Sequence, residues 1–367
     1  MKLKVLQENL NKALVSASRF VSPKAQLPVL GNILLKATKT KLIVASTNLE
    51  ISVASSVGAQ VKEEGEITVP ARSIAEVVAN LLPGSMSVSS EKEQLKIESQ
   101  SSTLVLSGMN SADFPSVPQK IEKARAMPFP KEAFLNALGQ VLFSTSIDET
   151  RPVLTGVLMI FSSGKLTMVA TDGFRLSQKK ISLQGKLGYR VIIPKTALIE
   201  CLRLAPEEEE ILFDYKEKEN QVAFGFSDTV LSSRVLEGDF PDFEKIMPKQ
   251  SSLSVEIDKE DFLRAVKLAS VFARDSANIV KLSIGKNSVE VFAESSQAGN
   301  QKTQVEAKTE GPGLEIAFNY RFLEELLHAI KGETVKVELS SPGSPGVFKD
   351  ASDPDFIHLI MPVRVQA

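Results

Sequence analysis

Side chains that carry enzymatic chemistry are scarce in this sequence. A catalytic or metal site needs a nucleophile, an acid or base, or a cluster of ligands. The 367 residues include two histidines, His328 and His358, and one cysteine, Cys201. Metal-binding Cys-x-x-Cys and His-Glu-x-x-His motifs and the phosphate-binding Gly-x-x-x-x-Gly-Lys-Ser/Thr loop are absent from the sequence. We therefore expect no enzyme, with no catalytic residue, no metal site and no cofactor.

An internal repeat gives these few residues ordinary structural places. Cys201 aligns with Val77 and Leu326 on the apolar side of a helix, so we expect it to be a small buried side chain. His328 falls on the outer face of the same kind of helix, and His358 alternates with apolar neighbours in a strand. We expect both histidines to be exposed to solvent.

The acidic residues that could act as ligands or bases also have plainer interpretations. Asp172 and Gly173 follow a strand, where a hairpin turn is more common than a metal carboxylate. Glu76, Glu200 and Glu325 occupy the same place in three repeats. A site built once would break the repeat, so this repetition argues against a catalytic role.

The repeat itself comprises two landmarks that recur at intervals of roughly 124 residues. A helix motif with apolar residues at helical spacing occurs at residues 9–14, 133–138 and 261–266. A strand ending followed by a second such helix begins at Val69, Ile193 and Phe318. A period this long indicates whole repeated domains. We predict three modules, at residues 1–122, 127–248 and 251–367.

Each module reads as strand, helix, strands, helix, strands. The strand segments alternate apolar and polar residues and are separated by short turns, as in antiparallel sheets with one covered face. We predict an α+β fold in which each module packs two helices on antiparallel sheets.

Composition narrows the class of protein. Charged residues make up 24% and hydrophobic residues 43% of the chain, as in globular proteins, and the net charge is −2. That charge argues against a surface that is basic all over, although one basic face remains possible. No apolar run approaches the ~18 residues of a membrane span, and the N-terminus has no signal-peptide pattern. We expect a cytoplasmic protein without a membrane partner.

Four motifs in order resemble those of the bacterial sliding clamp family, the beta subunits of the replicative DNA polymerase III. They are residues 27–32 (LPVLGN), 170–176 (ATDGFRL), 238–243 (GDFPDF) and 361–365 (MPVRV). The resemblance covers essentially the whole chain. It implies a head-to-tail homodimer that closes into a ring around double-stranded DNA, without sequence specificity, and gives the polymerase processivity. It places Leu104, Val271 and Phe272 at the dimer interface. Phe272 also fits the apolar stripe of its helix, so a core position stays open for it.

The helix faces opposite the apolar stripes should then line the hole. These faces carry sparse basic residues, and the resemblance adds Lys24 in a loop. The predicted DNA-facing residues are Lys12, Arg19, Lys24, Arg72, Lys195, Arg203, Arg264 and Lys267. Sparse contacts suit sliding, because affinity rises with each phosphate that is neutralised. For each of these residues, a position on a solvated surface without DNA contact remains an open alternative.

The resemblance also implies a pocket that binds short peptide motifs of the replicative polymerase, the clamp loader and repair polymerases. Its predicted lining is Leu154, Thr171, Gly173, Phe174, Arg175, Leu176, Pro241, Ile246, Asn319, Phe322, Met361, Pro362, Val363 and Arg364. Phe174 stands where the family often has histidine, and a Pro/Gly-rich segment, residues 341–346, lies nearby. For Met361 and Val363 a place in a strand core stays open, and so does an alternative function, a protein-interaction scaffold that does not encircle DNA.

Overall fold

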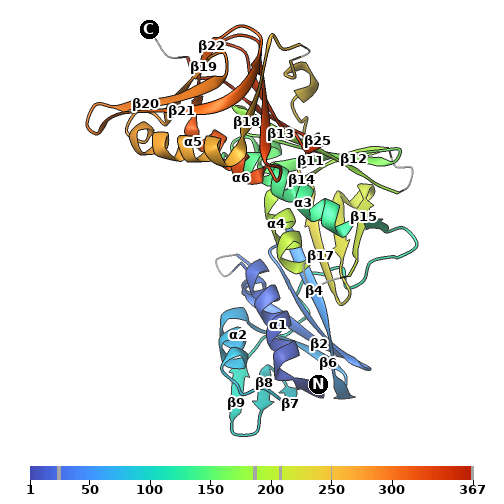
Figure 1. Ribbon diagram of the computed structural model, residues 1–367. Coiled ribbons are helices and arrows are strands. Elements are labelled where there is room, and N and C mark those ends of the chain that lie inside the picture. Colours follow the sequence, from blue (N-terminus) through green and yellow to red (C-terminus); the bar gives the residue numbers. More distant parts are fainter. Residues whose placement is uncertain (23–25, 185–187, 206–208, 249, 365–367) are drawn as a thin grey trace. The chain divides into compact units, whose positions relative to one another are not determined.

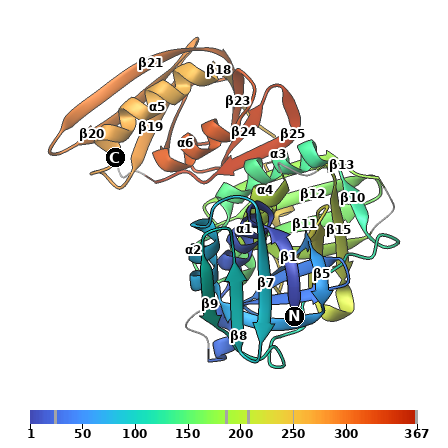
Figure 2. The same ribbon diagram turned by 90° about the horizontal axis from the view of Figure 1, so that it is seen from below.

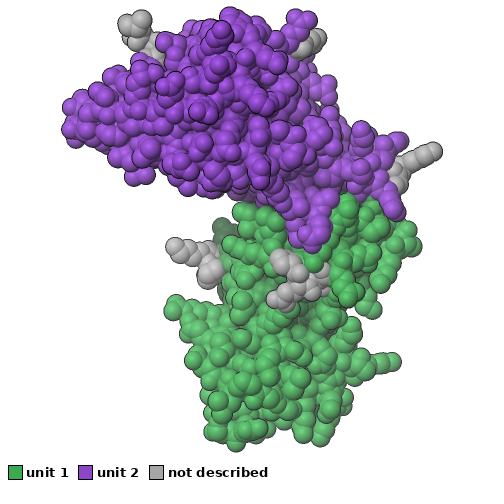
Figure 3. All heavy atoms as spheres, viewed as in Figure 1, with its two compact units in different colours: residues 1–131, 196–235 green, residues 132–195, 236–367 purple. Residues whose placement is uncertain are grey.

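The computed structural model describes residues 1–22, 26–184, 188–205, 209–248 and 250–364. The chain forms two compact units (Figure 3). Unit 1 comprises residues 1–131 and 196–235, and unit 2 comprises residues 132–195 and 236–367. Both units combine helices with antiparallel sheets (Figures 1 and 2), so the predicted α+β class is confirmed. The predicted second module, residues 127–248, contributes to both units, and the three module boundaries stay predictions.

Unit 1 contains two antiparallel sheets. The first has the order β5 (Gln60–Glu63), β1 (Lys2–Leu6), β7 (Ser85–Glu91), β8 (Gln94–Glu98), β9 (Thr103–Ser107). The second has the order β10 (Met127–Phe129), β15 (Ile211–Lys216), β16 (Gln221–Gly225), β17 (Thr229–Arg234), β4 (Ile51–Gly58), β3 (Lys41–Thr47), β2 (Asn32–Thr38), β6 (Gly65–Pro70). The pairing of β17 with β4 joins strands of the first and second predicted modules.

Unit 2 contains one sheet of twelve strands. Its order is β14 (Tyr189–Pro194), β11 (Gly156–Ser162), β12 (Lys165–Thr171), β13 (Arg175–Ser182), β25 (Asp353–Ile360), β24 (Gly346–Asp350), β23 (Thr334–Leu339), β18 (Leu253–Asp258), β21 (Gly299–Glu310), β20 (Ser288–Ser295), β19 (Ile279–Ile284), β22 (Leu314–Asn319). Here β13 pairs with β25, which joins the second and third predicted modules in the same way.

The described residues contain six α-helices, two for each predicted module. They are α1 (Gln7–Ala17), α2 (Ala71–Ala79), α3 (Lys131–Val141), α4 (Lys195–Leu204), α5 (Lys259–Ala273) and α6 (Tyr320–Ala329). Short 3-10 turns are η1 (Ser18–Phe20), η2 (Pro28–Gly31), η3 (Leu142–Ser144), η4 (Pro152–Thr155), η6 (Glu217–Glu219) and η7 (Phe243–Lys245). Side chains cap two of the helices: Asp258 accepts from the amide of Asp261 at 2.9 Å, and Asn319 accepts from that of Arg321 at 3.0 Å.

The apolar stripes of the helices form the cores, as their spacing predicts. In unit 2, α5 lies against β20, β21 and α6 (Figure 1). Phe262 and Val266 of α5 are fully buried. They join Phe318, Phe348 and Phe356 in one cluster. Burial of one such side chain contributes about 1.5–3 kcal/mol, so this cluster holds the helices onto the sheet. Cys201 is also fully buried, which confirms its expected place in the core.

The same turn follows the third strand of each predicted module, β3, β12 or β20. The hydroxyl of Thr47 accepts from the amide two residues on, as does that of Thr171, and Ser295 plays this part in the third copy. The turn after Thr171 is the hairpin turn expected at Asp172-Gly173, and Gly173 has a φ of +95° that favours glycine. This turn aligns β4, β13 and β21 as equivalent strands.

Two strands have fewer pairing neighbours than their equivalents in the other predicted modules. β4 lies between β3 and β17, and β13 lies between β12 and β25, but within the described residues the first half of β21, residues 299–306, pairs only with β20. Likewise β9 pairs only with β8, whereas its equivalents β17 and β25 each have two neighbours. Both strands therefore present backbone groups at an edge.

Candidate functional site

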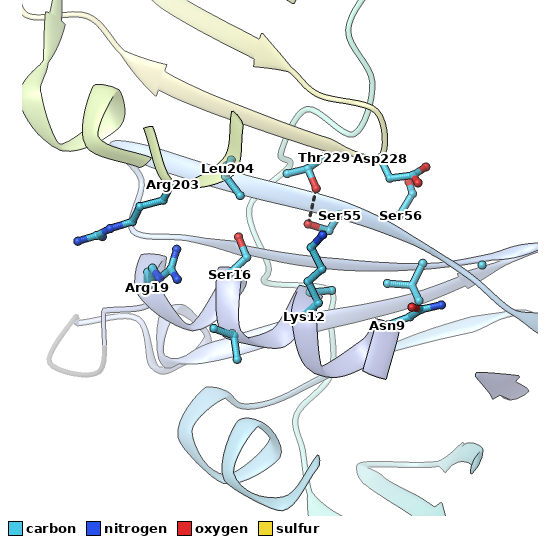
Figure 4. Close-up of a pocket in the computed structure, with 14 residues that line it drawn as sticks. Asn9, Lys12, Ser16, Arg19, Ser55, Ser56, Arg203, Leu204, Asp228 and Thr229 are labelled. Atoms are coloured by element: carbon cyan, nitrogen blue, oxygen red, sulfur yellow. Dashed lines mark hydrogen bonds between the residues drawn. The ribbon is translucent and has the colours of Figure 1, made fainter. Parts of the chain in front are cut away.

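A pocket in unit 1 gathers three of the predicted DNA-facing cations. Lys12 of α1, Arg19 of η1 and Arg203 of α4 line a cavity of about 480 Å³ (Figure 4). Its wall includes Ser55 of β4 and Thr229 of β17, whose hydroxyl oxygens are 2.9 Å apart. The cations thus meet at the β4–β17 junction, on elements that are far apart in sequence.

One carboxylate engages two of these cations. Arg19 donates from Nη1 to Oε2 of Glu200 at 3.1 Å, and Arg203 donates to Oε1 of the same carboxylate. The Glu200 side chain is 9% exposed. Because both guanidinium groups share this buried acid, they offer less positive charge to solvent than the sequence suggests. Their contact with DNA stays a prediction.

The other predicted cations are spread over several helices. Arg72 pairs with Glu76 at 2.8 Å, and Arg264 pairs with Asp261 at 3.1 Å. Lys267 is exposed on α5. Lys24 lies outside the described residues. Arg72 lies on a different helix from Arg264 and Lys267, and the DNA contact of all four cations stays a prediction.

Lys195 differs from the rest because it is half-buried at the start of α4. Burial lowers the pKa of its ammonium group, and the positive charge of Arg175 lowers this pKa further, while Glu325 acts in the opposite direction. Lys195 is therefore tied electrostatically to the residues of the β13–β25 junction.

Arg175 is the centre of that junction in unit 2. Its side chain is 8% exposed and bonds to Asp172 at 3.0 Å, to the carbonyl oxygen of Phe143 at 2.7 Å, and to Glu325. Its guanidinium group also lies 4.5 Å from the ring centroid of Phe322. Each of its three guanidinium nitrogens thus donates a hydrogen bond inside the protein, and sequence reasoning placed it only in the peptide pocket.

His358 corrects an expectation. We expected an exposed histidine, but the side chain is fully buried in β25, beside the ring of Phe143. Nδ1 lies 2.7 Å from the hydroxyl of Ser177, which lies 2.7 Å from that of Ser144. Burial, and secondarily the charge of Arg175, lowers the pKa of His358 to about 3. Other parts of the protein cover both faces of β25 here. The alternation of apolar residues in its sequence therefore gave a wrong prediction that His358 is exposed.

His328 is exposed at the end of α6, as expected, and its Nδ1 lies 2.7 Å from the carbonyl oxygen of Glu324. Among the described residues, no three His, Cys, Asp or Glu side chains are grouped as ligands for a metal ion. Of the helices in these segments, none combines the length and the apolar character of a membrane span.

The predicted peptide-pocket residues all belong to unit 2, but they differ in accessibility. The buried members are Leu154, Thr171, Arg175 and Leu176. The half-buried members are Asn319, Phe322, Pro362 and Val363. The exposed members are Gly173, Phe174, Pro241, Ile246, Met361 and Arg364. The second and third groups are therefore accessible from solvent, whereas the first group is not.

Two of the exposed members lie side by side. Phe174 is 63% exposed and accepts, through its carbonyl oxygen, the amide of Met361 at 2.8 Å. Further along, the amide of Val363 donates to Ala317 at 2.8 Å. Residues 361–363 are thus tied to the turn between β12 and β13 and to β22, and Met361 is exposed, not a strand-core residue.

A groove of about 780 Å³ lies beside that terminal segment. It is lined by Lys281, Leu282, Ser283, Glu290, Phe292, Glu315, Ile316, Ala317, Pro342, Gly343, Val363 and Arg364. The segment that reaches Phe174 therefore also borders a hollow with apolar and charged side chains. The Pro/Gly-rich turn that the sequence singled out contributes to this groove.

The predicted dimer-interface residues lie next to the two strand edges. Leu104 is half-buried in β9, and Val271 of α5 is 54% exposed. Phe272 packs against the core of unit 2, as its apolar stripe predicts. Sequence reasoning missed Val105 of β9 and Leu268 of α5, which are also exposed. The i, i+3 spacing of Leu268 and Val271 could have revealed this second apolar face.

Other residues missed from the sequence tie segments together. The carboxylate of Asp353 in β25 accepts hydrogen bonds from Nζ of Lys179 at 2.6 Å and from Nε2 of Gln140 at 3.1 Å. No spacing in the sequence relates these three residues. Glu200 and Glu325, by contrast, had a signal, namely their repeated position.

Comparisons with known proteins cover the whole chain. Family models for the N-terminal, central and C-terminal domains of the DNA polymerase III beta subunit match residues 1–118, 129–242 and 244–364. A beta sliding clamp of Staphylococcus aureus is 32% identical over 357 residues, which cover 94% of each chain. That of Chlamydia muridarum is 30% identical over 370 residues, covering 100% of this chain and 99% of the other. The crystal structure of a Bacillus subtilis DNA polymerase sliding clamp matches with a TM-score of 0.95 and 26% identity, covering 100% of both chains.

Proposed function

This chain belongs to the DNA polymerase III beta subunit family, the beta sliding clamps, and we propose that it closes as a head-to-tail homodimer into a ring around duplex DNA. It is a non-catalytic subunit that confers processivity on DNA polymerase III. The proposal extends this to the geometry of the ring, the DNA-facing residues and the peptide site.

The observation that carries the ring is the pair of open strand edges. The first module meets the second through β4 and β17, and the second meets the third through β13 and β25. The strands left over are β9 and the first half of β21, and they are the equivalents of those that pair inside the chain. If β9 of one copy pairs with β21 of another, both edges disappear and two copies form a closed ring.

The side chains at these edges fit such a pairing. The ladders place Leu104 opposite buried Ile97 and Leu231 opposite buried Phe224, so the two leucines are equivalent. Leu231 lies opposite Val53 in β4, whose counterpart in β21 is Gln301. The β13–β25 ladder has the same register, because His358, the counterpart of Leu231, lies opposite Ser177, the counterpart of Val53. In this register Leu104 would lie opposite Gln301.

Helix α5 extends this face. Leu268 and Val271 are exposed apolar side chains on a helix that packs on β21. Burying them with Leu104 against a second copy would remove apolar surface from water. This supports Leu104 and Val271 as interface residues, with Phe272 holding the helix end in place from the core side.

The lining proposed for the ring is basic but sparse. Lys12, Arg72, Arg264 and Lys267 are exposed on α1, α2 and α5. Four of the predicted cations pair with acidic residues on the same or a neighbouring helix, namely Arg19, Arg72, Arg203 and Arg264. Weak, exchangeable phosphate contacts without base readout suit a protein that slides. We propose the same lining role for Arg19, Lys195 and Arg203, and for Lys24 beyond the described residues.

We also propose that short peptide motifs of the replicative polymerase, the clamp loader and repair polymerases bind beside Phe174 and Met361. Exposed apolar side chains and a neighbouring groove support this site. Gly173, Pro241, Ile246, Asn319, Phe322, Pro362, Val363 and Arg364 complete its proposed lining. The cytoplasm, where such partners work on DNA, is the proposed location.

The decisive experiment loads the protein onto nicked circular DNA with a clamp loader. A ring should stay on the circle through high salt and slide off after the circle is linearised. Equal loss from circular and linear DNA would instead favour the protein-interaction scaffold that does not encircle DNA. A Val271→Glu variant is the matched control, because it should remain folded but fail to stay on the circle.

A further inference from the structure

The sixth residue of the second helix is a glutamate in all three modules. Glu76 occupies this place in α2, Glu200 in α4 and Glu325 in α6. The positions are equivalent in structure as well as in sequence, because each helix starts directly after an edge strand, β6, β14 or β22. Two of the three glutamates have a common task.

That task is to hold a cation of the preceding module. Glu200 of the second module accepts from Arg19, which lies in η1 just after α1 of the first module. Glu325 of the third module accepts from Arg175 of the second. Each ion pair therefore spans a junction that is also closed by a strand ladder.

The cation that pairs with the glutamate comes from a different position in the second module than in the first. Phe143 stands in η3 where Arg19 stands in η1, so the second module has no arginine at that position. Arg175 supplies the charge from β13 and bonds to the carbonyl oxygen of Phe143 at 2.7 Å. The carboxylate thus still meets the end of the preceding module's first helix, through Arg175.

Glu76 has no preceding module in its own chain. Its side chain is 64% exposed, and it pairs with Arg72, one turn earlier on α2, at 2.8 Å. In the proposed ring, the module before it is the third module of a second copy. The first helix of that module is α5, and the position of Arg19 is taken there by Val271.

Arg274 is the cation best placed at the end of α5. It follows the helix as Arg19 follows α1, and it lies three residues after Val271, on the same face. It is exposed, and within the described segments its side chain forms no ion pair. We propose that Glu76 pairs across the subunit junction with Arg274 of the partner subunit, and that Arg72 flanks this carboxylate as Arg203 flanks Glu200.

This inference rests on the proposed ring and adds an ion pair that helps to hold its two subunits together. The intersubunit pair is more exposed than its internal counterpart at Glu200, so salt should screen it more strongly. The junction that must open for loading would then be the one held by the most salt-sensitive pair.

The test is a double-mutant cycle on the dimer dissociation constant, measured by analytical ultracentrifugation at low and moderate salt. Glu76→Gln and Arg274→Gln should each raise this constant about 3- to 10-fold at low salt, and the double variant should be no weaker than the weaker single variant. The difference from the unmodified protein should shrink as salt rises. Arg72→Gln measures what the pair within α2 contributes, and Lys267→Gln is the matched control on α5.

Three results would overturn the pairing while leaving the ring intact. The effects of Glu76→Gln and Arg274→Gln on the dimer dissociation constant could be additive. Glu76→Gln could have the same effect as Arg72→Gln and show no coupling to Arg274. Glu76 could instead be coupled to Lys267. A protein that is monomeric at every concentration would overturn the proposed ring and the pairing together. Retention on circular DNA separates these cases.

Discussion

The two junctions inside the chain share a backbone plan and differ in their side chains. β17 on β4 and β13 on β25 are both antiparallel ladders. The first carries small hydroxyls, with Ser52 and Ser232 at 2.6 Å. The second buries Arg175 and His358. The strand ladder fixes where modules join, and the side chains fix how each joint responds to charge and pH.

The two junctions differ in which charged side chain they bury. At the first, Glu200 is buried between two arginines that keep contact with solvent. At the second, Arg175 itself is buried, between Phe143 and Phe322. Removing a buried charge partner is costly, whereas trimming an exposed one is cheap. The second joint should therefore be the more fragile to substitution.

Arg175→Met should give the largest effect. The change keeps most of the side-chain volume but removes the bonds to Asp172, Glu325 and the Phe143 carbonyl, so we expect a loss of about 3 kcal/mol. Hydrogen exchange of β13 and β25 amides, with urea unfolding, measures it. Protection of β4 and β17 should be unchanged, and equal loss at both junctions would break the comparison.

Lowering the pH should weaken the second junction next. Histidine is neutral in both states above pH 6.5, but below it the unfolded chain takes up a proton that folded His358 refuses until about pH 3. Folding stability should fall with falling pH across this window, by about 2 kcal/mol at pH 5.

His358→Asn isolates this contribution. Asparagine keeps an acceptor near Ser177 but does not titrate. Unfolding free energies measured from pH 7 to pH 4 should fall less steeply for the variant. Parallel curves for the two proteins would show that His358 titrates normally in the folded chain.

Arg19→Met, the matched change at the first junction, should cost only about 1 kcal/mol. Arg203 stays on Glu200, and the Arg19 side chain is 38% exposed. Hydrogen exchange of β4 and β17 is the readout. A loss as large as that from Arg175→Met would mean that burial does not distinguish the two joints.

The smallest effect should come from the serine pair. Ser52→Ala leaves the Ser232 hydroxyl without its partner at 2.6 Å, at a cost of about 1 kcal/mol or less. The double change Ser52→Ala and Ser232→Ala should cost less than the sum of the single changes, because neither hydroxyl is then stranded. Additive costs in urea unfolding would argue that the pair does not interact.

Local pattern was sufficient for much of this fold. The apolar spacing of Leu10, Ala13 and Leu14 predicted a helix with one buried side, and the alternation in β20 predicted an antiparallel strand. The hairpin turn at Asp172-Gly173 was readable because the pair directly follows a strand and contains a glycine. These features depend on residues close together in the chain.

Features that depend on two distant segments were not readable. Glu200 was recognised only by its repeated position, and its ion pair with Arg19 was not readable, because Arg19 has no basic counterpart in the other modules. His358 was misjudged because coverage of its strand by both layers leaves no trace in the alternation. The repeat predicted equivalent positions, but the side chains that use them diverge between copies.

The open edge of β9 has a consequence for the newly made protein. Val105 is 57% exposed on a strand whose outer backbone groups await a partner. Until a second copy arrives, any extended chain could add to this edge and seed aggregates. The polar and charged side chains of β21, among them Gln301, Lys302 and Thr303, make the complementary edge a poor template for random pairing. Synthesis at low concentration would thus be the period of greatest risk, and ring closure would also serve as protection against self-association.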